Sequence, residues 1–234
     1  MAKHLDLEEQ EQLDQIKHFW KEYGNLISWL LIVVFGAIAA WNGWQYWQRT
    51  SAAQAATLYD EVERAATAGD ITRVERAFAD LKDKFGRTTY AQQAGMLAAK
   101  ALADKGNVDG AKAALAWVAE KSSDEGYAAL ARLRMASLLV ESKSYDEALK
   151  QLSGDFPDAF KGLAADRRGD VLQAQGKREE ARAEYIKAYK ALDDRSEYRR
   201  LLEVKLSALG TDPKQLVPAP ANAASASASG TAKS

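Results

Sequence analysis

An uncharged run, Gly24–Gln48, constrains this chain more than any other sequence feature. The charged residues Glu22 and Arg49 flank it closely. About 20 apolar residues are enough to cross the hydrocarbon core of a bilayer as an α-helix. A lone segment in lipid must satisfy its backbone hydrogen bonds internally, and a helix does so. The run therefore predicts a single transmembrane helix over residues 24–48.

The residues around the run favour insertion into a membrane. Five of the six tryptophans lie within residues 20–47, and Trp and Tyr side chains prefer the bilayer interface. One alternative is the core helix of a soluble hairpin, although such a helix rarely stays uncharged for this length. Another is a cleaved signal peptide, which usually has a shorter apolar core after a basic start. Because small residues follow at Ser51–Ala55, cleavage stays open.

Basic residues near the span predict its orientation, because Lys and Arg are retained on the cytoplasmic side. Lys3, Lys17 and Lys21 precede the run, whereas Arg49 and Arg64 follow it over a similar reach. This bias predicts a cytoplasmic amino terminus and an exported carboxy-terminal domain. The absence of cysteine is compatible with an oxidising compartment. The net charge of −1 gives no reason to expect nucleic acid as a partner.

Two smaller patterns belong to the anchor region. In the segment 1–23, four large apolar residues fall on one face of a helix: Leu13, Ile16, Trp20 and Tyr23. This face predicts an amphipathic helix that lies at the interface or docks on a partner, or a simple lead-in that settles on the headgroups. Inside the span, small residues that would let another membrane helix approach are Gly36, Ala40 and Gly43.

Beyond Arg49 the chain shows helix after helix, with short breaks that contain Gly or Asp. The clearest unit comprises Arg168–Leu172, a turn at Gly176, and then Ala181, Tyr185 and Ala188. It matches the tetratricopeptide pattern, in which two helices, A and B, touch at small residues and an aromatic fills the remaining gap. Small or medium residues recur at the helix-B position, spaced by 37, 37 and 33 residues: Val74, Ala111, Ala148 and Ala181.

The pattern predicts an all-α protein: a single-pass transmembrane helix followed by a tetratricopeptide-like α-solenoid of degenerate helical hairpins over residues 49–210. A generic irregular helical bundle is the alternative. A final helix over Ser196–Leu209 would cover the last open repeat face, as such arrays require. The Ala/Ser/Pro-rich tail, residues 211–234, has almost no large apolar side chains, so we expect it to be disordered.

We find no motif for catalysis, a cofactor or a metal ion. The sequence contains no Gly-rich phosphate loop, metal-ligand spacing or nucleophile elbow. Histidine occurs only at His4 and His18, both before the span. We therefore expect a binding protein rather than an enzyme, although this search does not cover a site built from Asp, Glu, Lys or Tyr alone.

Helical-hairpin arrays bind partners on a concave surface lined mainly by their A helices. The repeat register places nine residues on that surface: Gln93, Met96, Lys100, Leu133, Ser137, Glu141, Asp166, Asp170 and Gln173. The set is mixed polar, which favours an ordered protein or an extended peptide over a lipid tail. A spacer without a binding role is the alternative.

The order of these parts resembles the YfgM-like family of bitopic inner-membrane proteins. The resemblance rests on Glu9–Leu13, Phe19–Gly24 and, above all, the Gly43–Gln48 end of the span. It implies an ancillary subunit of the SecYEG translocon with a cytoplasmic amino terminus and a periplasmic tetratricopeptide-like domain. It also implies association with a periplasmic chaperone or peptidyl-prolyl isomerase and with emerging secretory polypeptides. An alternative role is control of an envelope-stress regulator through the cytoplasmic segment. The family brings no catalytic residues.

Overall fold

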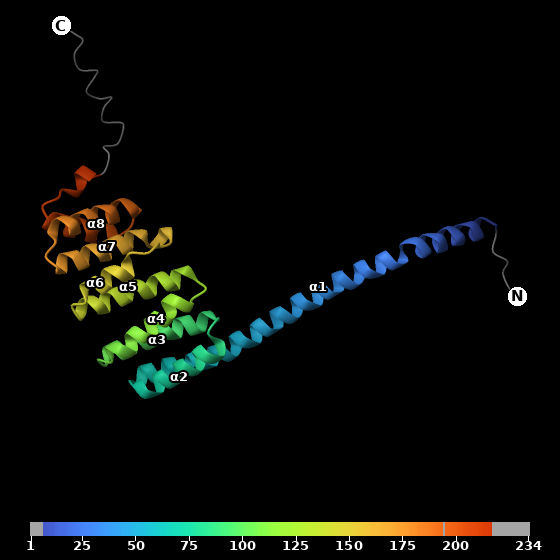
Figure 1. Cartoon of the computed structure of the whole chain (residues 1–234), viewed down its shortest axis with the longest axis horizontal. Helices are drawn as coiled ribbons and strands as arrows, with labels where there is room; N and C mark the ends of the chain where they lie inside the picture. The colour runs from blue at the N-terminus through green and yellow to red at the C-terminus, as the bar shows by residue number, and fades with distance from the viewer. Residues whose placement is uncertain (1–6, 194, 217–234) are drawn as a thin grey trace, which may run out of the picture. The chain divides into compact units, whose positions relative to one another are not determined.

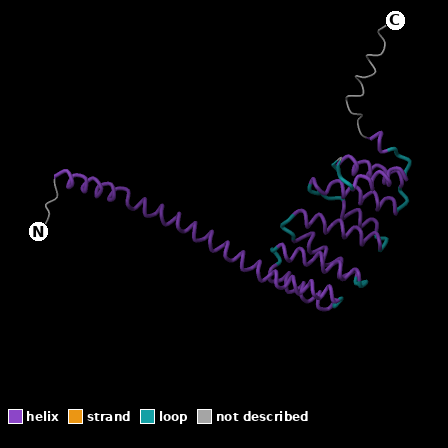
Figure 2. Tube along the Cα trace, turned by 180° about the vertical axis from the view of Figure 1, so that it is seen from behind, coloured by secondary structure: helices purple, strands orange, loops and turns teal. Residues whose placement is uncertain are grey.

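The computed structural model describes residues 7–193 and 195–216. Throughout these residues the ordered elements are helices, and no strand occurs among them (Figure 2). In chain order they are α1 Leu7–Ala68, α2 Ile71–Phe85, α3 Thr89–Asp104, α4 Val108–Lys121, α5 Glu125–Glu141, α6 Tyr145–Leu152, α7 Asp158–Ala174, α8 Arg178–Ala191, α9 Tyr198–Ala208 and the 3-10 turn η1 Pro213–Leu216. The predicted all-α class is confirmed. The predicted disordered tail, apart from residues 211–216, lies outside the described residues.

The chain divides into two compact units, the first ending at Gln54 and the second beginning at Ala55. The predicted span forms part of α1, which does not stop at residue 48 but continues to Ala68 because no Gly or Pro interrupts it there. Its apolar side chains are exposed, with Phe35 64% and Trp41 65% accessible. Within the described residues, this is the one helix long and apolar enough to cross a membrane, and only 6% of its most apolar stretch is buried. The buried-core alternative is therefore wrong.

A shared turn ends every A helix in the second unit. One residue in each turn has a positive φ, between +60° and +81°: Gly69, Gly106, Lys143, Gly176 and Gly210. The N–H of the following residue donates to the carbonyl five residues earlier, for example Asn107 to Leu102 at 2.9 Å and Ser144 to Leu139 at 2.8 Å. This is the Schellman motif, which favours glycine because a Cβ is strained at positive φ. The first four turns repeat the predicted intervals of 37, 37 and 33 residues.

The last turn identifies α9 as an additional A helix. Gly210 follows Gly176 by 34 residues and has the same positive φ, +77°. The predicted closing helix is therefore the first half of a fifth hairpin. Leu202 and Leu206 on α9 are completely buried and join a cluster with Tyr185 and Tyr189 of α8. The exposed face of the fourth hairpin is thus covered, as expected for the end of a repeat array.

The repeat positions found in the sequence form the core. The four helix-B positions are each 0% exposed: Val74, Ala111, Ala148 and Ala181. Opposite them, seven residues before each turn, the A helices carry Val62, Ala99, Ala136 and Gly169, which are also buried. A Cβ added at Gly169 would stand 2.4 Å from Cε1 of Tyr185, so the tyrosine ring occupies the space that a larger residue would need. Figure 1 shows helices α2 to α8 stacked in chain order.

We expect Lys143→Gly to stabilise the repeat unit, because Lys143 is the only non-glycine residue with positive φ among the described residues (φ +60°). A residue with a Cβ costs about 1 kcal/mol or more in this conformation, whereas glycine does not. Glycine also loses more chain entropy on folding, which offsets part of the gain. We expect a net increase of about 0.5–1 kcal/mol in the free energy of unfolding, measured by urea denaturation.

Lys143→Ala is the matched control, since it removes the charge but keeps the Cβ. It should leave the free energy of unfolding within about 0.5 kcal/mol of the natural chain. Equal stabilisation by both substitutions would show that the lysine charge, and not backbone strain, destabilises this turn.

Candidate protein-binding surface

All nine residues predicted for the concave surface lie on A helices, three each on α3, α5 and α7. Three of them are buried, which corrects the expectation that they face a partner: Met96 is 5% exposed, Leu133 7% and Asp166 0%. Each precedes the turn of its helix by ten residues. Asp166 contacts α9, the next A helix. This register position therefore packs against neighbouring helices and does not reach the surface.

The other six residues are partly or fully exposed. Lys100 pairs with Asp104 at 2.6 Å, and Nε2 of Gln93 donates to the Tyr127 hydroxyl at 2.8 Å. Ser137 donates its hydroxyl to the Leu133 carbonyl at 3.2 Å. Asp170 takes part in an ionic cluster, while Glu141 and Gln173 are exposed. Whether these six side chains bind a partner stays a prediction.

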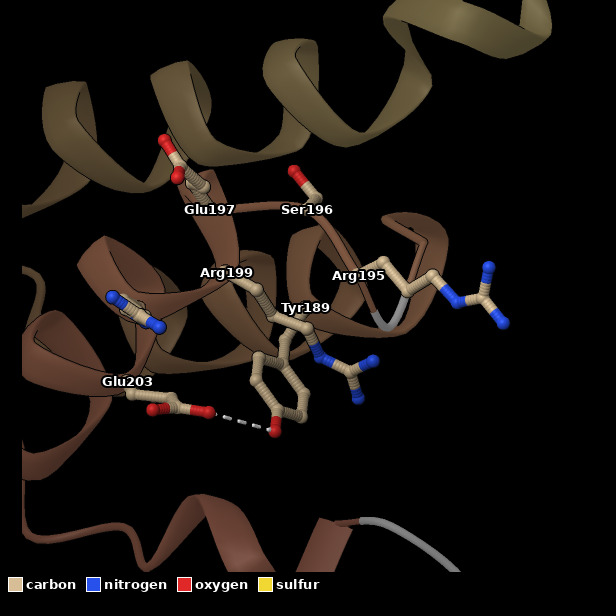
Figure 3. Close-up of a pocket in the computed structure, with 7 residues that line it drawn as sticks. Tyr189, Arg195, Ser196, Glu197, Arg199 and Glu203 are labelled. Atoms are coloured by element: carbon tan, nitrogen blue, oxygen red, sulfur yellow. Dashed lines mark hydrogen bonds between the residues drawn. The ribbon is translucent and has the colours of Figure 1, made fainter.

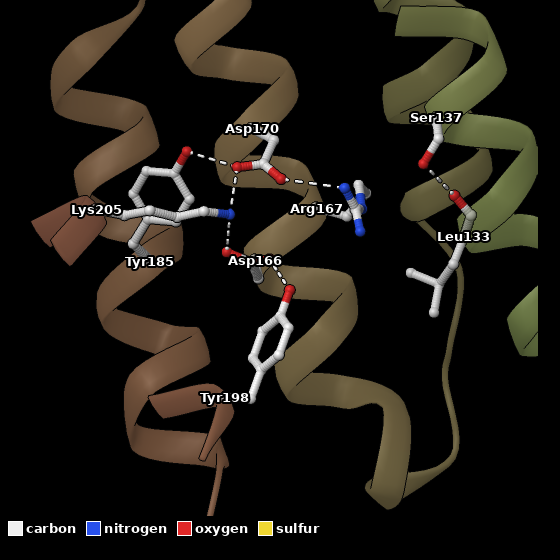
Figure 4. Close-up of polar contacts among 8 residues, drawn as sticks. All are labelled: Leu133, Ser137, Asp166, Arg167, Asp170, Tyr185, Tyr198 and Lys205. Carbon is white, nitrogen blue, oxygen red and sulfur yellow. Dashed lines mark hydrogen bonds and ion pairs between the residues drawn. The ribbon is translucent and has the colours of Figure 1, made fainter. Parts of the chain in front are cut away.

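The ionic cluster links α7, α8 and α9 (Figure 4). Nζ of Lys205 lies 2.7 Å from Oδ1 of Asp166 and 2.6 Å from Oδ1 of Asp170. The Tyr198 hydroxyl donates to Oδ2 of Asp166 at 2.6 Å, and the Tyr185 hydroxyl donates to Oδ1 of Asp170 at 2.9 Å. A buried carboxylate is tolerated only when it is paired and hydrogen-bonded. The cluster supplies these partners to Asp166.

The two tyrosines in this cluster are held in their protonated form. Burial, followed by the hydrogen bond to Asp170, raises the pKa of Tyr185 above its ordinary value. Burial and the hydrogen bond to Asp166 raise the pKa of Tyr198 in the same way. Both hydroxyls therefore remain donors, since ionisation would place a negative charge beside a carboxylate. The cluster is a structural junction between helices.

The sequence did not identify this junction. It placed Asp166 and Asp170 on an exposed face, and it gave no role to Lys205. One signal was available: Lys205 lies within the apolar pattern of Leu202, Leu206 and Leu209. A charged residue at such a position calls for a buried partner of opposite charge. Within the described residues, no group of three or more His, Cys, Asp or Glu side chains is placed to hold a metal ion.

A recess of about 460 Å³ lies at the α8–α9 junction (Figure 3). Its lining residues are Tyr189, Arg195, Ser196, Glu197, Arg199, Arg200 and Glu203. The guanidinium of Arg199 covers the Tyr189 ring, 4.0 Å from its centroid, and the Tyr189 hydroxyl donates to Glu203 at 3.3 Å. The Arg195 side chain points away from these groups. The recess carries both acidic and basic side chains, and they do not point toward one common position. Its lining therefore does not indicate which kind of ligand would bind there.

A second recess, of about 320 Å³, lies between the A helices α3 and α5, with a contribution from α4. It is lined by Ala99, Lys100, Ala103, Leu115, Arg134, Ser137 and Leu138. Lys100 and Ser137 are two of the predicted surface residues, so the structure brings these two together. Arg134 was not among the predicted residues. This recess therefore lies on the predicted face.

The anchor residues are accessible in the first unit. Leu13 is 41% exposed, Trp20 61% and Tyr23 45%, whereas the Ile16 side chain lies outside those described. Ala40 is exposed, and nothing lies within 4 Å of a Cβ added at Gly36 or Gly43. Roles for these residues in interfacial binding and helix packing stay predictions.

Comparison with known proteins identifies the family. The tetratricopeptide repeat-like domain family matches residues 17–211. The chain is similar to a Neisseria gonorrhoeae protein named ancillary SecYEG translocon subunit, with 33% identity over 213 residues that cover 89% of this chain and 100% of the relative. An Escherichia coli protein of the same name is 29% identical over 178 residues, or 75% of this chain and 84% of that protein. A Haemophilus influenzae protein of the same name is 27% identical over 186 residues, which cover 78% of this chain and 89% of that protein. The chain therefore belongs to the YfgM-like family of tetratricopeptide repeat-like proteins, to which these translocon subunits belong.

Proposed function

We propose that this chain is a membrane-anchored scaffold that associates with the SecYEG translocon and binds proteins through its repeat domain. The observation that carries the proposal is the similarity to translocon subunits along nearly the whole chain, span and repeats included. An exposed apolar helix and a repeat unit are the parts that such a scaffold needs. The name of the relatives also favours the inner membrane as its location.

The orientation and the soluble partners are further parts of the proposal. The excess of lysines before the span supports a cytoplasmic amino terminus and a periplasmic repeat domain. In that compartment the domain would bind a chaperone or peptidyl-prolyl isomerase and receive emerging polypeptides. Helical repeats bind proteins through extended surfaces of this kind. We infer a binding role rather than a catalytic one, because the relatives are named as translocon subunits and the matched family is a repeat-like domain.

Site-specific photocrosslinking tests the association with the translocon. A photoreactive residue at Ala40, on the small-residue face of the span, should crosslink to a translocon subunit. The matched control is the same residue at Ile38, which is also exposed but lies about 160° away around the helix, at 100° per residue. A failure to crosslink from every position between residues 24 and 48 would contradict the proposed association. Equal crosslinking from both positions would contradict only the packing face.

A reporter active only in the periplasm, inserted after Gly210, tests the orientation. We expect activity there and none for the same reporter at the amino terminus. The opposite pattern would place the repeat domain in the cytoplasm and would rule out periplasmic partners.

A further inference from the structure

The recess between α3 and α5 has an apolar interior and a basic rim. Ala99, Ala103, Leu115 and Leu138 provide its apolar surface, whereas Lys100, Arg134 and Ser137 are polar. Its volume of about 320 Å³ is at the lower end of the range for small-ligand sites, about 300–1,000 Å³. It has room for a bulky side chain and adjoining backbone but not for a folded element.

The recess lies where the second hairpin carries small and medium-sized side chains. Four residues after the helix-B anchor, the first and fourth hairpins carry the buried aromatic residues Phe78 and Tyr185. The second hairpin carries Leu115 at this position. Leucine fills less space than an aromatic ring, and Ala99 and Ala103 on the facing helix α3 contribute little side-chain volume. With leucine here, as in the third hairpin at Leu152, the second hairpin has less side-chain volume beside the recess than an aromatic residue would supply.

The two basic side chains at the rim, Lys100 and Arg134, differ in whether an acidic side chain pairs with them. Lys100 on α3 is paired with Asp104 at 2.6 Å, and on α7 Arg167 is paired with Asp170 at 3.3 Å. Arg134 on α5 and Arg167 on α7 occupy the same repeat position, nine residues before the turn that ends each helix. The Arg134 side chain is exposed. It has no ion pair or hydrogen bond within the part of the chain that the structure describes. The rim thus presents a net positive charge beside an apolar surface.

We propose that this recess binds an extended protein segment, taking one bulky aliphatic side chain into its interior while an adjacent Asp or Glu pairs with Arg134. The apolar surface favours the aliphatic group, and the uncompensated guanidinium favours a carboxylate. The Ser137 hydroxyl donates its proton to the Leu133 carbonyl within α5, so its oxygen remains free to accept a hydrogen bond from a backbone N–H of the bound segment. This inference rests on the proposed function as a protein-binding scaffold and specifies the chemistry of the bound segment.

Peptide binding to the full chain in phosphatidylcholine nanodiscs tests the inference. The probe is a fluorescein-labelled peptide of ten residues, Gly and Ser throughout except for a central Leu flanked by two Asp. Fluorescence anisotropy should show saturable binding. Replacing the peptide Leu with Gly should weaken binding about tenfold or more, because burying a leucine side chain contributes that much. Replacing both Asp with Asn should weaken it about fivefold, the upper range for an exposed ion pair.

Variants of the chain separate the two contacts. Arg134→Gln should weaken binding about fivefold, whereas Arg134→Lys should retain most of it. Ala103→Leu should weaken binding through loss of space while leaving the charge unchanged. Arg134→Glu should reverse the preference, so that a peptide with Lys in place of Asp binds better. Arg76→Gln is the matched control, since Arg76 is an exposed arginine on α2 away from the recess, and it should have no effect.

Three results would overturn the inference: no binding, binding that is insensitive to Arg134→Gln, or equal competition by decanoate, which would indicate a lipid-type site. A failure of this inference can be distinguished from a failure of the proposed translocon association. Loss of peptide binding with intact crosslinking of the span to the translocon would remove this inference alone. Loss of crosslinking with intact peptide binding would remove the translocon association alone.

Discussion

Lys205→Met should lower the stability of the α7–α9 junction by about 3 kcal/mol. The substitution keeps the length and apolar stem of the side chain but removes the charge between Asp166 and Asp170. Asp166 is completely buried, and among the described residues it would keep the Tyr198 hydroxyl as its one side-chain donor. Removing one member of a buried ion pair typically costs about 3–5 kcal/mol, and we take the lower figure because Lys205 is partly exposed.

Hydrogen exchange of the α9 amides is the appropriate measurement, because repeat arrays can lose their end units without unfolding globally. We expect exchange protection in α9 to fall about 100-fold, which corresponds to the loss of about 3 kcal/mol. Amides of α3 and α4 should keep their protection and serve as an internal control. Unchanged protection in α9 would show that the cluster does not stabilise the junction.

The double variant Asp166→Met with Lys205→Met should recover most of the lost protection. The two preceding A helices carry Met96 and Leu133 at the position of Asp166, and both are buried. An apolar residue of similar size therefore suits this position in the repeat. Replacing both members of a buried ion pair with apolar groups is often neutral. A double variant less stable than Lys205→Met alone would contradict this interpretation.

Gly169→Ala should destabilise the fourth hairpin by about 2 kcal/mol. The added Cβ would lie 2.4–2.5 Å from two carbons of the Tyr185 ring. The ring cannot move aside easily, since Tyr185 is only 3% exposed and its hydroxyl donates to Asp170. Overpacking of this kind costs about 1–3 kcal/mol, even though alanine is the better helix former by up to about 1 kcal/mol. Urea denaturation and exchange protection in α7 and α8 measure the loss.

The same substitution should be harmless in a Tyr185→Leu background. The two middle hairpins carry Ala99 with Leu115 and Ala136 with Leu152 at the corresponding positions, and all four residues are buried. Tyr185→Leu has its own cost, because it removes the hydrogen bond to Asp170. Adding Gly169→Ala to this background should then be neutral or stabilising. An equal cost in both backgrounds would show that the clash with the ring is not the cause.

The transmembrane helix and the repeat period were predictable because both are local patterns. A span needs only enough uncharged apolar residues in succession, and Gly24–Gln48 provides them. The helix-B residues Val74, Ala111, Ala148 and Ala181 are small or medium-sized because hairpin helices approach closely there, so their spacing revealed the repeats. The turn at Lys143 was harder to recognise, since a residue with a Cβ stands where the related turns have glycine.

The surface was predicted less accurately because exposure depends on residues distant in sequence. Sequence alone determined a membrane-anchored stack of helical hairpins and assigned the candidate binding residues to its A helices. Only the tertiary structure showed that Asp166 is buried, because its partner Lys205 lies 39 residues away on α9. Likewise, the recess beside Arg134 depends on how α3, α4 and α5 meet. Helical periodicity fixes which residues share a face, whereas packing between helices decides which of them reach the solvent.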